Sequence, residues 1–352
     1  MTLKEVIKQI RPADGSARAA ARRRWDAVAH PLDSLGLLEE AVVRVAGVQG
    51  TPAVDISKRA VVAMCADNGV VAEGVTQSGQ DVTAIVTENM ARGATSVCCM
   101  GRVAGAEVYP VDIGVAVPVK GERIIQRCIR RGTANLAVGP AMKREECERA
   151  VLAGVEIAGE LAERGYRLLL TGEMGIGNTT TSAAVAAVLL GKDPAEVTGR
   201  GAGLTSEGLT KKIDAIRRGI AVNRPDPADP LDVLYKVGGL DIAGLTGVFL
   251  GGALHRVPVL VDGFISSVAA LAAARLCPAS VDAMLASHAS GEPAGRMVLD
   301  TLGLKPPIAA GMRLGEGTGA VALLPLLDMA LAVYREMVSF EDAAIEAYEH
   351  LT

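Results

Sequence analysis

The segment TGEMGIGNTTTSAAV at residues 171–185 combines a glycine turn, an acidic side chain and several hydroxyl groups. The run RLLL at 167–170 before it is typical of a buried strand, and the small apolar residues at 183–190 behind it are typical of a packed helix. Backbone N–H groups at the start of a helix are unpaired and lie at the positive end of the helix dipole, so they bind anions. The segment therefore predicts a phosphate site that contains Gly175, Gly177, Asn178, Thr179 and Thr180.

Two known glycine-loop patterns fit this segment only in part. The triphosphate-loop pattern G-x-x-x-x-G-K-[ST] fits residues 172–179, except that Asn178 stands where a lysine clamps the outer phosphates. The dinucleotide pattern G-x-G-x-x-G has Thr180 in place of its third glycine, which allows close helix packing. We therefore interpret the segment as a monophosphate site. A plain strand-to-helix turn is the alternative.

A second glycine turn, MRLGEGTGA at residues 312–320, holds Glu316 ahead of the apolar run at 321–327. Glycines on both sides of the acid allow positive φ angles and the close approach of a ligand. An acid exposed by such a turn suits general acid–base chemistry, so Glu316 is a candidate catalytic residue. The alternative is an acid that complements the dipole at a helix N-terminus.

The chain resembles the nicotinate-nucleotide:dimethylbenzimidazole phosphoribosyltransferases, which make the lower-ligand nucleotide of cobalamin. The resemblance runs nearly from end to end and includes both glycine turns. The other matching segments are HPLDSLGLLEE at 30–40, MCADNGVVAEGV at 64–75, VTAIVTENMARGATSVC at 82–98, NLAVGPAM at 135–142, TGRGAGL at 198–204, LYKVGGLDIAGLTGVFLGGA at 234–253, VPVLVDGFISS at 257–267 and SHASGE at 287–292. Chance does not produce so many matches in the same order.

The resemblance implies transfer of the phosphoribosyl group of nicotinate mononucleotide to a ring nitrogen of 5,6-dimethylbenzimidazole. The products are α-ribazole 5′-phosphate and nicotinate. Because the pyridinium nitrogen is already a good leaving group, the protein must supply position and a base rather than a metal. The match makes Glu316 the base and places Glu173 near the ribose, with a helix N-terminal charge as the alternative for Glu173.

The resemblance also assigns further residues to the nucleotide. Lys212 matches a lysine near the phosphate or the ribose, and Arg313 either pairs with nicotinate or stabilises the Glu316 turn. Lesser candidates for the nucleotide site are Gly201, Gly263 and Ser290.

The acceptor pocket is where the chain departs most from the family. Ser78 matches a pocket position, whereas Val86 stands where some members have glutamine, and Asn68 stands where many have histidine. Because Val86 lacks the amide of that glutamine, a different benzimidazole, a purine or a phenol is an alternative acceptor. Met174 and Leu314 complete the residues expected at the base. A phosphoribosyltransferase with another acceptor and a non-enzymatic nucleotide sensor are the alternative functions.

Composition favours small-molecule partners or a second copy of the chain. The 352 residues are 50% hydrophobic and only 22% charged, which allows a large core. A net charge of −4 and 3% aromatic residues argue against a nucleic-acid surface. The charged start MTLKEVIK does not resemble a secretory signal, and the apolar runs at 240–254 and 321–333 are too short or interrupted to span a membrane. We expect a cytoplasmic protein.

The cysteines and histidines predict no metal site. Cys65, Cys98, Cys99, Cys128, Cys147 and Cys277 show no CxxC spacing and no histidine at zinc-ligand intervals. Of the four histidines, His288 alone lies in a family-like motif, where we favour a structural or orienting role. We expect neither a metal nor a cofactor.

The elements predict an α/β fold. Short β-rich runs at 60–65, 107–113, 167–170 and 257–261 alternate with helical stretches at about 82–104, 141–164, 206–221 and 265–276, which indicates a parallel sheet wrapped by helices. Ligands bind beyond the carboxyl ends of such strands, where the loops at 67–74, 172–180 and 262–266 are expected.

Both ends of the chain are expected to be helical and to pack together. The resemblance implies a Rossmann-like large domain at about 46–311, a small helical domain built from 1–45 and about 312–352, and a homodimer. The proline-rich run NRPDPADP at 223–230 is interpreted as a crossing loop, with a domain boundary as the alternative.

Overall fold

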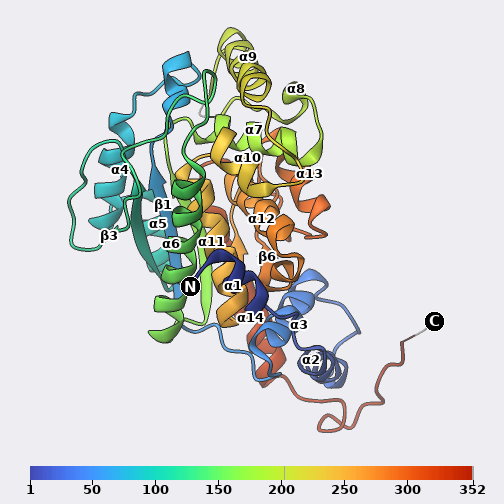
Figure 1. Cartoon of the computed structure of the whole chain (residues 1–352). Helices are drawn as coiled ribbons and strands as arrows, with labels where there is room; N and C mark the ends of the chain where they lie inside the picture. The colour runs from blue at the N-terminus through green and yellow to red at the C-terminus, as the bar shows by residue number, and fades with distance from the viewer. Residues whose placement is uncertain (202, 351–352) are drawn as a thin grey trace.

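The computed structural model describes residues 1–201 and 203–350 of the chain. In this part of the chain six parallel strands form one sheet in the order β3-β2-β1-β4-β5-β6, with helices around it (Figure 1). The strands are β1 (Arg59–Ala66), β2 (Ala106–Gly114), β3 (Ile125–Gln126), β4 (Leu168–Met174), β5 (Val259–Val261) and β6 (Met284–Ala286). The α-helices are α1 (Leu3–Gln9), α2 (Gly15–Ala27), α3 (Leu37–Gln49), α4 (Asp81–Ala91), α5 (Ser96–Ala104), α6 (Arg144–Glu163), α7 (Asn178–Leu190), α8 (Pro194–Val197), α9 (Ser206–Asn223), α10 (Pro230–Val237), α11 (Leu240–His255), α12 (Phe264–Leu276), α13 (Pro293–Thr301) and α14 (Thr318–Glu336), and two 3-10 helices are η1 (Gly69–Glu73) and η2 (Pro278–Ala283).

The sheet is buried on both faces, and this explains the unbroken apolar sequence of its central strand. Along β1, Val61 and Ala63 belong to one apolar core, while Val62 and Met64 belong to the other. Helices α6, α7, α11 and α12 contribute to the core of Val62, and helices α3, α5 and α14 contribute to the core of Val61. A strand covered on both sides needs no polar residue between its apolar ones.

The predicted parallel α/β fold is confirmed. The strands expected at 60–65, 107–113, 167–170 and 257–261 correspond to β1, β2, β4 and β5. The strand order is that of Rossmann-type sheets, in which the order reverses beside the first strand. Strands β3 and β6, which have two and three residues, were not predicted.

Two of the expected helices are wrong in extent. The single helix expected at 82–104 is two helices, because the chain turns at Gly93 with a φ of +75° before α5 begins. The C-terminal helix ends at Glu336, and residues 337–350 form a bridge, turns and coil. Phe340 is the only side chain buried in this last segment as described, so little apolar contact supports a helix there.

The two ends of the chain lie side by side. Helix α14 packs on α3, and the ring of Trp25 in α2 lies 5.1 Å from that of Tyr334 in α14. The N–H of Phe340 donates to the carbonyl of Ala27 at 3.0 Å. Both ends contribute to the apolar core on the Val61 face of the sheet. The division into a small and a large domain stays a prediction.

Helix α14 is apolar enough and long enough to cross a membrane by composition alone, but 56% of its most apolar stretch is buried inside the protein. It packs on α3, α5 and β4, and Asp328 on its exposed side pairs with Arg59 of β1. Burial in the core accounts for the apolar sequence of α14.

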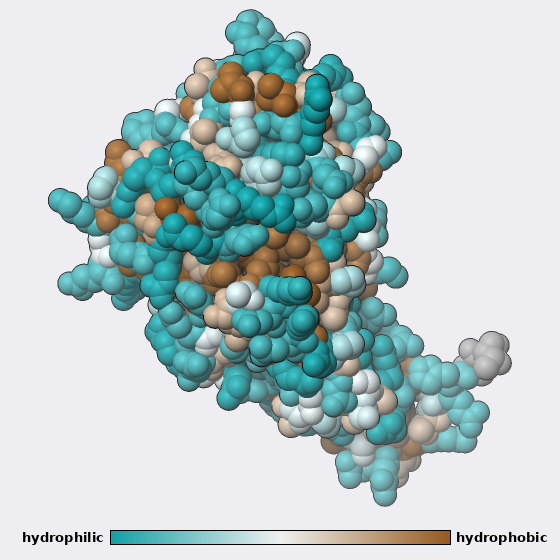
Figure 2. Space-filling view, in the orientation of Figure 1, coloured by the Kyte–Doolittle hydropathy of each residue, from teal (hydrophilic) through white to brown (hydrophobic). Residues whose placement is uncertain are grey.

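The face drawn in Figure 2 is mostly hydrophilic, and apolar side chains gather in a hollow near its middle.

Candidate active site

A cavity of about 220 Å³ opens at the carboxyl ends of β4, β5 and β6. It lies next to the reversal of strand order between β1 and β4, which is where open parallel sheets bind ligands. The sequence-predicted residues that line it are Glu173, Met174, Gly175, Gly177, Asn178, Thr179, Gly201, Lys212, Gly263, Ser290, Arg313, Leu314 and Glu316. Residues more than a hundred positions apart in the chain are thus brought to one site.

Three of the predicted residues lie outside the lining. Thr180 is fully buried within α7, because neighbouring helical residues point about 100° apart and Thr179 takes the side that faces the cavity. The Thr180 side chain therefore faces the core and not the cavity. Ser78 is half-buried in the loop before α4, and Val86 on α4 packs against the same apolar core as Met174.

The end of the cavity at which the sequence predicts a phosphate is built on the turn between β4 and α7. Gly177, with a φ of +93°, is the residue before the helix, and no described side chain caps the first turn of α7. The Lys212 ammonium of α9 donates to Thr179 Oγ1 at 2.8 Å and to the Gly199 carbonyl at 3.2 Å. Burial lowers the pKa of Lys212 to about 8, opposed by the charge of Glu292. Helix N–H groups and a buried cation therefore meet here.

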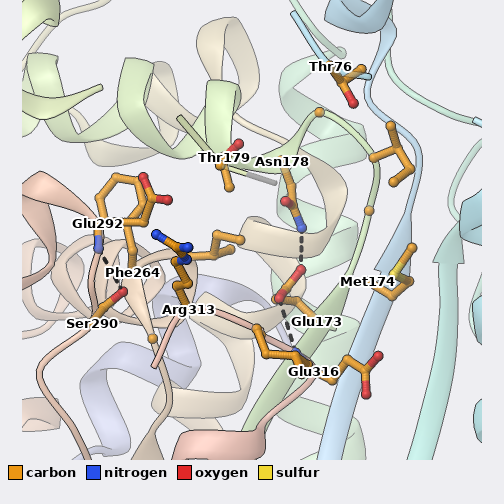
Figure 3. A pocket seen from close by; sticks show the side chains of 18 of the residues that line it. Thr76, Glu173, Met174, Asn178, Thr179, Phe264, Ser290, Glu292, Arg313 and Glu316 are labelled. Atoms are coloured by element: carbon orange, nitrogen blue, oxygen red, sulfur yellow. Dashed lines mark hydrogen bonds between the residues drawn. The ribbon is translucent and has the colours of Figure 1, made fainter. Parts of the chain in front are cut away.

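Glu173, near the end of β4, is a buried carboxyl in the lining. Its Oε2 accepts a hydrogen bond from Asn178 Nδ2, and its Oε1 accepts one from the Glu316 N–H at 3.3 Å (Figure 3). Burial raises the pKa of Glu173 to about 8, helped by the charges of Asp241 and Asp262 and opposed by the Asn178 hydrogen bond. Glu173 therefore holds a proton at neutral pH and acts there as a neutral polar group.

Glu316 lies in a tight turn with a positive φ of +61°, between Gly315 at +88° and Gly317 at +100°. Positive φ in a residue other than glycine is costly and is typical of functional sites. The Glu316 Oε2 accepts a hydrogen bond from the Val97 N–H at 3.1 Å, in the first turn of α5. The side chain points toward Met174, away from Ser290, and its backbone N–H faces Glu173 (Figure 3).

Gly172, five residues before Gly177, makes the close approach of the Glu316 turn possible. A Cβ at position 172 would overlap the carbonyl oxygen of Glu316. The glycine-rich pattern of residues 172–177 thus has two structural effects: Gly172 lets the Glu316 turn lie directly on β4, and Gly177 precedes the first turn of α7, where the sequence predicts a phosphate site.

Several lining residues were not named as site residues from the sequence. The most important is Asp262, which directly follows β5 and whose carboxylate accepts backbone hydrogen bonds from the Glu316 segment. The sequence placed the loop 262–266 at the binding edge of the sheet but gave Asp262 itself no role. The other such residues include Thr76, Arg200, Phe264, His288 and Glu292.

Asn68, whose family position is often histidine, lies beneath the glycine turn and not in the cavity lining. Its buried side chain lies beside that of Asp241, and a Cβ at Gly175 would come within 3.2 Å of Asn68 Nδ2 and 2.8 Å of Asp241 Oδ2. Burial raises the pKa of Asp241 to about 6, opposed by the hydrogen bond that the Ile242 N–H donates to Asp241 Oδ1 at 3.0 Å. Both side chains pack against the glycine turn at Gly175.

Metal-ligating side chains are not clustered in the part of the chain that the structure describes. No group of three or more His, Cys, Asp or Glu side chains there is arranged to hold a metal ion. The six cysteines are free thiols, and burial raises the pKa of Cys65 to about 12.

A family model described as a phosphoribosyltransferase matches residues 10–345. The chain belongs to this phosphoribosyltransferase family. It is 47% identical to the nicotinate-nucleotide–dimethylbenzimidazole phosphoribosyltransferase of Ruminiclostridium cellulolyticum over the whole of both chains. Its identity to the protein of that name from Escherichia coli is 43%, over 96% of this chain and 94% of the relative.

The fold agrees with that of a solved structure of the family. The crystal structure of CobT from Thermus thermophilus superposes with a TM-score of 0.90 at 41% identity, over 95% of this chain and all of the other. The six-stranded sheet and the cavity at its carboxyl edge are thus the framework of a phosphoribosyltransferase.

We predict that Glu173→Gln changes the pH dependence of folding stability. Between about pH 4.5 and 8 the folded chain holds a proton on Glu173 that the unfolded chain has lost, so this group makes the wild type less stable as pH rises. Glutamine does not titrate. The free energy of unfolding of the variant minus that of the wild type should therefore increase by on the order of 1–3 kcal/mol from pH 5 to pH 8.

Urea unfolding at both pH values measures this difference. Glu207→Gln is the matched control, because Glu207 is exposed on α9 and should show no comparable gain. A constant difference between Glu173→Gln and wild type across this pH range would show that Glu173 is ionised in the folded protein.

Proposed function

We propose that the chain transfers the 5-phosphoribosyl group of nicotinate mononucleotide to 5,6-dimethylbenzimidazole, giving α-ribazole 5′-phosphate and nicotinate. This reaction belongs to the assembly of the nucleotide loop of cobalamin. The observation that carries the proposal is the meeting of two glycine turns at one cavity, with the Glu316 N–H bound to Glu173 Oε1. The curated relatives that share nearly the full length of the chain bear the name of this reaction.

The donor is oriented by groups at the two ends of the cavity. The N-terminus of α7, the Thr179 hydroxyl and the Lys212 ammonium hold the 5′-phosphate, with Gly201, Gly263 and Ser290 beside them. Arg313 supplies a positive charge to an anionic group of the nucleotide, and the neutral Glu173 carboxyl hydrogen-bonds the ribose hydroxyls. Fixing the donor in this way exposes one face of the anomeric carbon to the acceptor.

The acceptor lies on the Glu316 side, between Met174 and Leu314. Ser78 and Val86 lie outside the cavity lining, and the family match alone assigns them to the acceptor. Its unprotonated ring nitrogen forms a bond to the anomeric carbon while the bond from that carbon to the pyridinium nitrogen breaks. The electron pair of the broken bond neutralises the pyridinium, and the proton of the second azole nitrogen passes to the Glu316 carboxylate. Attack opposite the leaving group inverts the β-linked donor and gives the α-linked product.

An acceptor panel tests this function and separates it from its alternatives. Purified protein is incubated with nicotinate mononucleotide and either dimethylbenzimidazole, adenine or a phenol, and nicotinate release and product mass are measured. Release that requires dimethylbenzimidazole is the expected result. Release only with a purine or phenol would assign another lower-ligand base, and tight nucleotide binding with no release for any acceptor would favour a nucleotide sensor.

We predict that Glu316→Gln lowers kcat by roughly 10²- to 10⁴-fold, because glutamine cannot accept the acceptor's proton. The dissociation constant for nicotinate mononucleotide should change little, since Glu316 faces the acceptor side. Steady-state kinetics and calorimetric titration measure the two quantities. A loss of kcat below about tenfold would remove Glu316 from the role of base.

We predict that affinity for nicotinate mononucleotide falls above about pH 8. Lys212 has a lowered pKa of about 8 in the free protein, so its positive charge is present below that pH and is lost above it. Calorimetric titration at pH 7, 8 and 9 should show a fall of up to about tenfold per pH unit at the alkaline end. Lys212→Met should weaken binding and abolish the decline.

Lys211→Met is the matched control for this prediction. Lys211 is the neighbouring lysine of α9 but is exposed and paired with Glu207 at 2.8 Å. This variant should keep both the affinity and the pH dependence of the wild type. An unchanged decline in Lys212→Met would assign the pH dependence to another group.

We propose, on the family resemblance, that the chain is a cytoplasmic homodimer. Its substrates are small molecules, a nucleotide and an aromatic base, and the proposal includes no nucleic acid, membrane, metal or cofactor. The net charge of −4 is consistent with the absence of a nucleic-acid partner.

A further inference from the structure

Asp262 occupies the space between the end of β5 and the start of α14. Its side chain is buried, and both carboxylate oxygens accept backbone hydrogen bonds from the chain that follows Glu316. Oδ2 accepts from the Gly317 N–H at 3.3 Å, and Oδ1 accepts from the Ala320 N–H at 2.9 Å. One side chain thus binds the N–H group of the residue before α14 and an N–H group in its first turn.

These bonds replace a cap that α14 does not supply itself. The residue before the helix is Gly317, which has no side chain to bind the unpaired N–H groups. An acid at this position usually comes from the helix's own sequence, but here it comes from a strand end 55 residues earlier. The start of α14 is therefore tied to the sheet.

Two hydrogen bonds hold Glu316 in place, the one to Asp262 and a second one to Glu173. Its own N–H donates to Glu173 Oε1 at 3.3 Å, and the next N–H, that of Gly317, donates to Asp262 Oδ2. Glu173 ends β4 and Asp262 follows β5, which is the neighbouring strand of the sheet. Two adjacent strand ends thus hold the two peptide groups that set the φ angle and direction of Glu316.

Asp262 is itself fixed from the sheet. Its N–H donates to Thr171 Oγ1 at 3.2 Å, and the Thr171 hydroxyl donates to the Leu260 carbonyl at 2.9 Å. On its other side, the His288 ring packs against Gly319, where any Cβ would overlap it. Asp262 therefore has little freedom to move, and the same is true of the turn that it binds.

We propose that Asp262 is a positioning residue for the transfer reaction, which acts by holding the Gly315–Gly317 turn so that Glu316 points at the acceptor. The proposal rests on the role of Glu316 proposed above. If Asp262 instead contacted the substrate directly, its substitution would change the affinity for the nucleotide. Substitution of a positioning residue lowers kcat, and does so only in a protein that still has Glu316.

The experiment compares Asp262→Asn in two backgrounds, wild type and Glu316→Gln. Asparagine keeps the shape but turns an NH₂ group toward one of the two N–H donors, which breaks that bond and repels it. In the wild-type background kcat should fall at least tenfold or so, while the dissociation constant for nicotinate mononucleotide stays within about threefold. In the Glu316→Gln background the same change should lower kcat by less than about threefold.

Asp112→Asn is the matched control. Asp112 is also a buried aspartate near the end of a parallel strand, and its carboxylate accepts from the Val115 N–H at 2.9 Å and pairs with Arg131 at 2.8 Å. It is not part of the cavity lining. Its variant should lose stability but keep kcat within about threefold of wild type. A merely structural effect would lower kcat equally in Asp112→Asn and Asp262→Asn at matched loss of stability.

Each remaining outcome decides the proposal. Equal losses of kcat in the two backgrounds, or a loss of nucleotide affinity in place of kcat, would overturn it and assign Asp262 a direct contact with substrate. Full kcat in Asp262→Asn, with a large loss in Glu316→Gln, would overturn the positioning role alone; full kcat in Glu316→Gln would overturn the base role on which it rests. If Asp262→Asn does not fold, Thr171→Val, which removes the bond to the Asp262 N–H, takes its place with the same criteria.

Discussion

The contact on which the site depends is the crossing of the Glu316 turn over the end of β4. There the Glu316 N–H donates to Glu173 Oε1, although 143 positions separate the two residues, and the Glu316 carbonyl lies where Gly172 has no side chain. A larger residue at position 172 would push the turn away from the sheet. The missing side chain at Gly172 and the hydrogen bond from the Glu316 N–H thus bring the carboxyls of Glu173 and Glu316 to the same cavity.

The Glu173 carboxyl is buried where it makes this contact, and burial changes its protonation state at neutral pH. With its pKa raised to about 8, Glu173 is a neutral hydrogen-bonding group at physiological pH, whereas the Glu316 carboxyl is oriented by the Val97 N–H of α5. Two glutamates of the same site therefore have different surroundings and different chemistry. Burial of Glu173 costs stability at neutral and alkaline pH, which is common where a protein holds polar groups ready for a substrate.

The sheet topology explains why the two glycine turns meet at this edge. Strand order reverses at β1 and β4, so the loops that follow them separate and leave a crevice. The turn before α7 lies at this crevice, while Asp262 after β5 and Glu173 near the end of β4 hold the turn that carries Glu316. The strand ends therefore position both the proposed phosphate site and the proposed base.

The sequence by itself determined the family, the parallel α/β fold and half of the cavity lining, because glycine turns, buried strands and family motifs are local patterns that can be read without coordinates. It also predicted a phosphate site at the turn before α7 and a catalytic role for Glu316. Only the tertiary structure decided that Thr180 faces the core, that residues 82–104 form two helices, and that Asp262 holds the Glu316 turn. Those facts depend on the direction of a helix face, on one glycine in the left-handed region and on contacts between distant segments. Side-chain burial, and with it the pKa of Glu173, likewise arises only when the whole chain packs around the group.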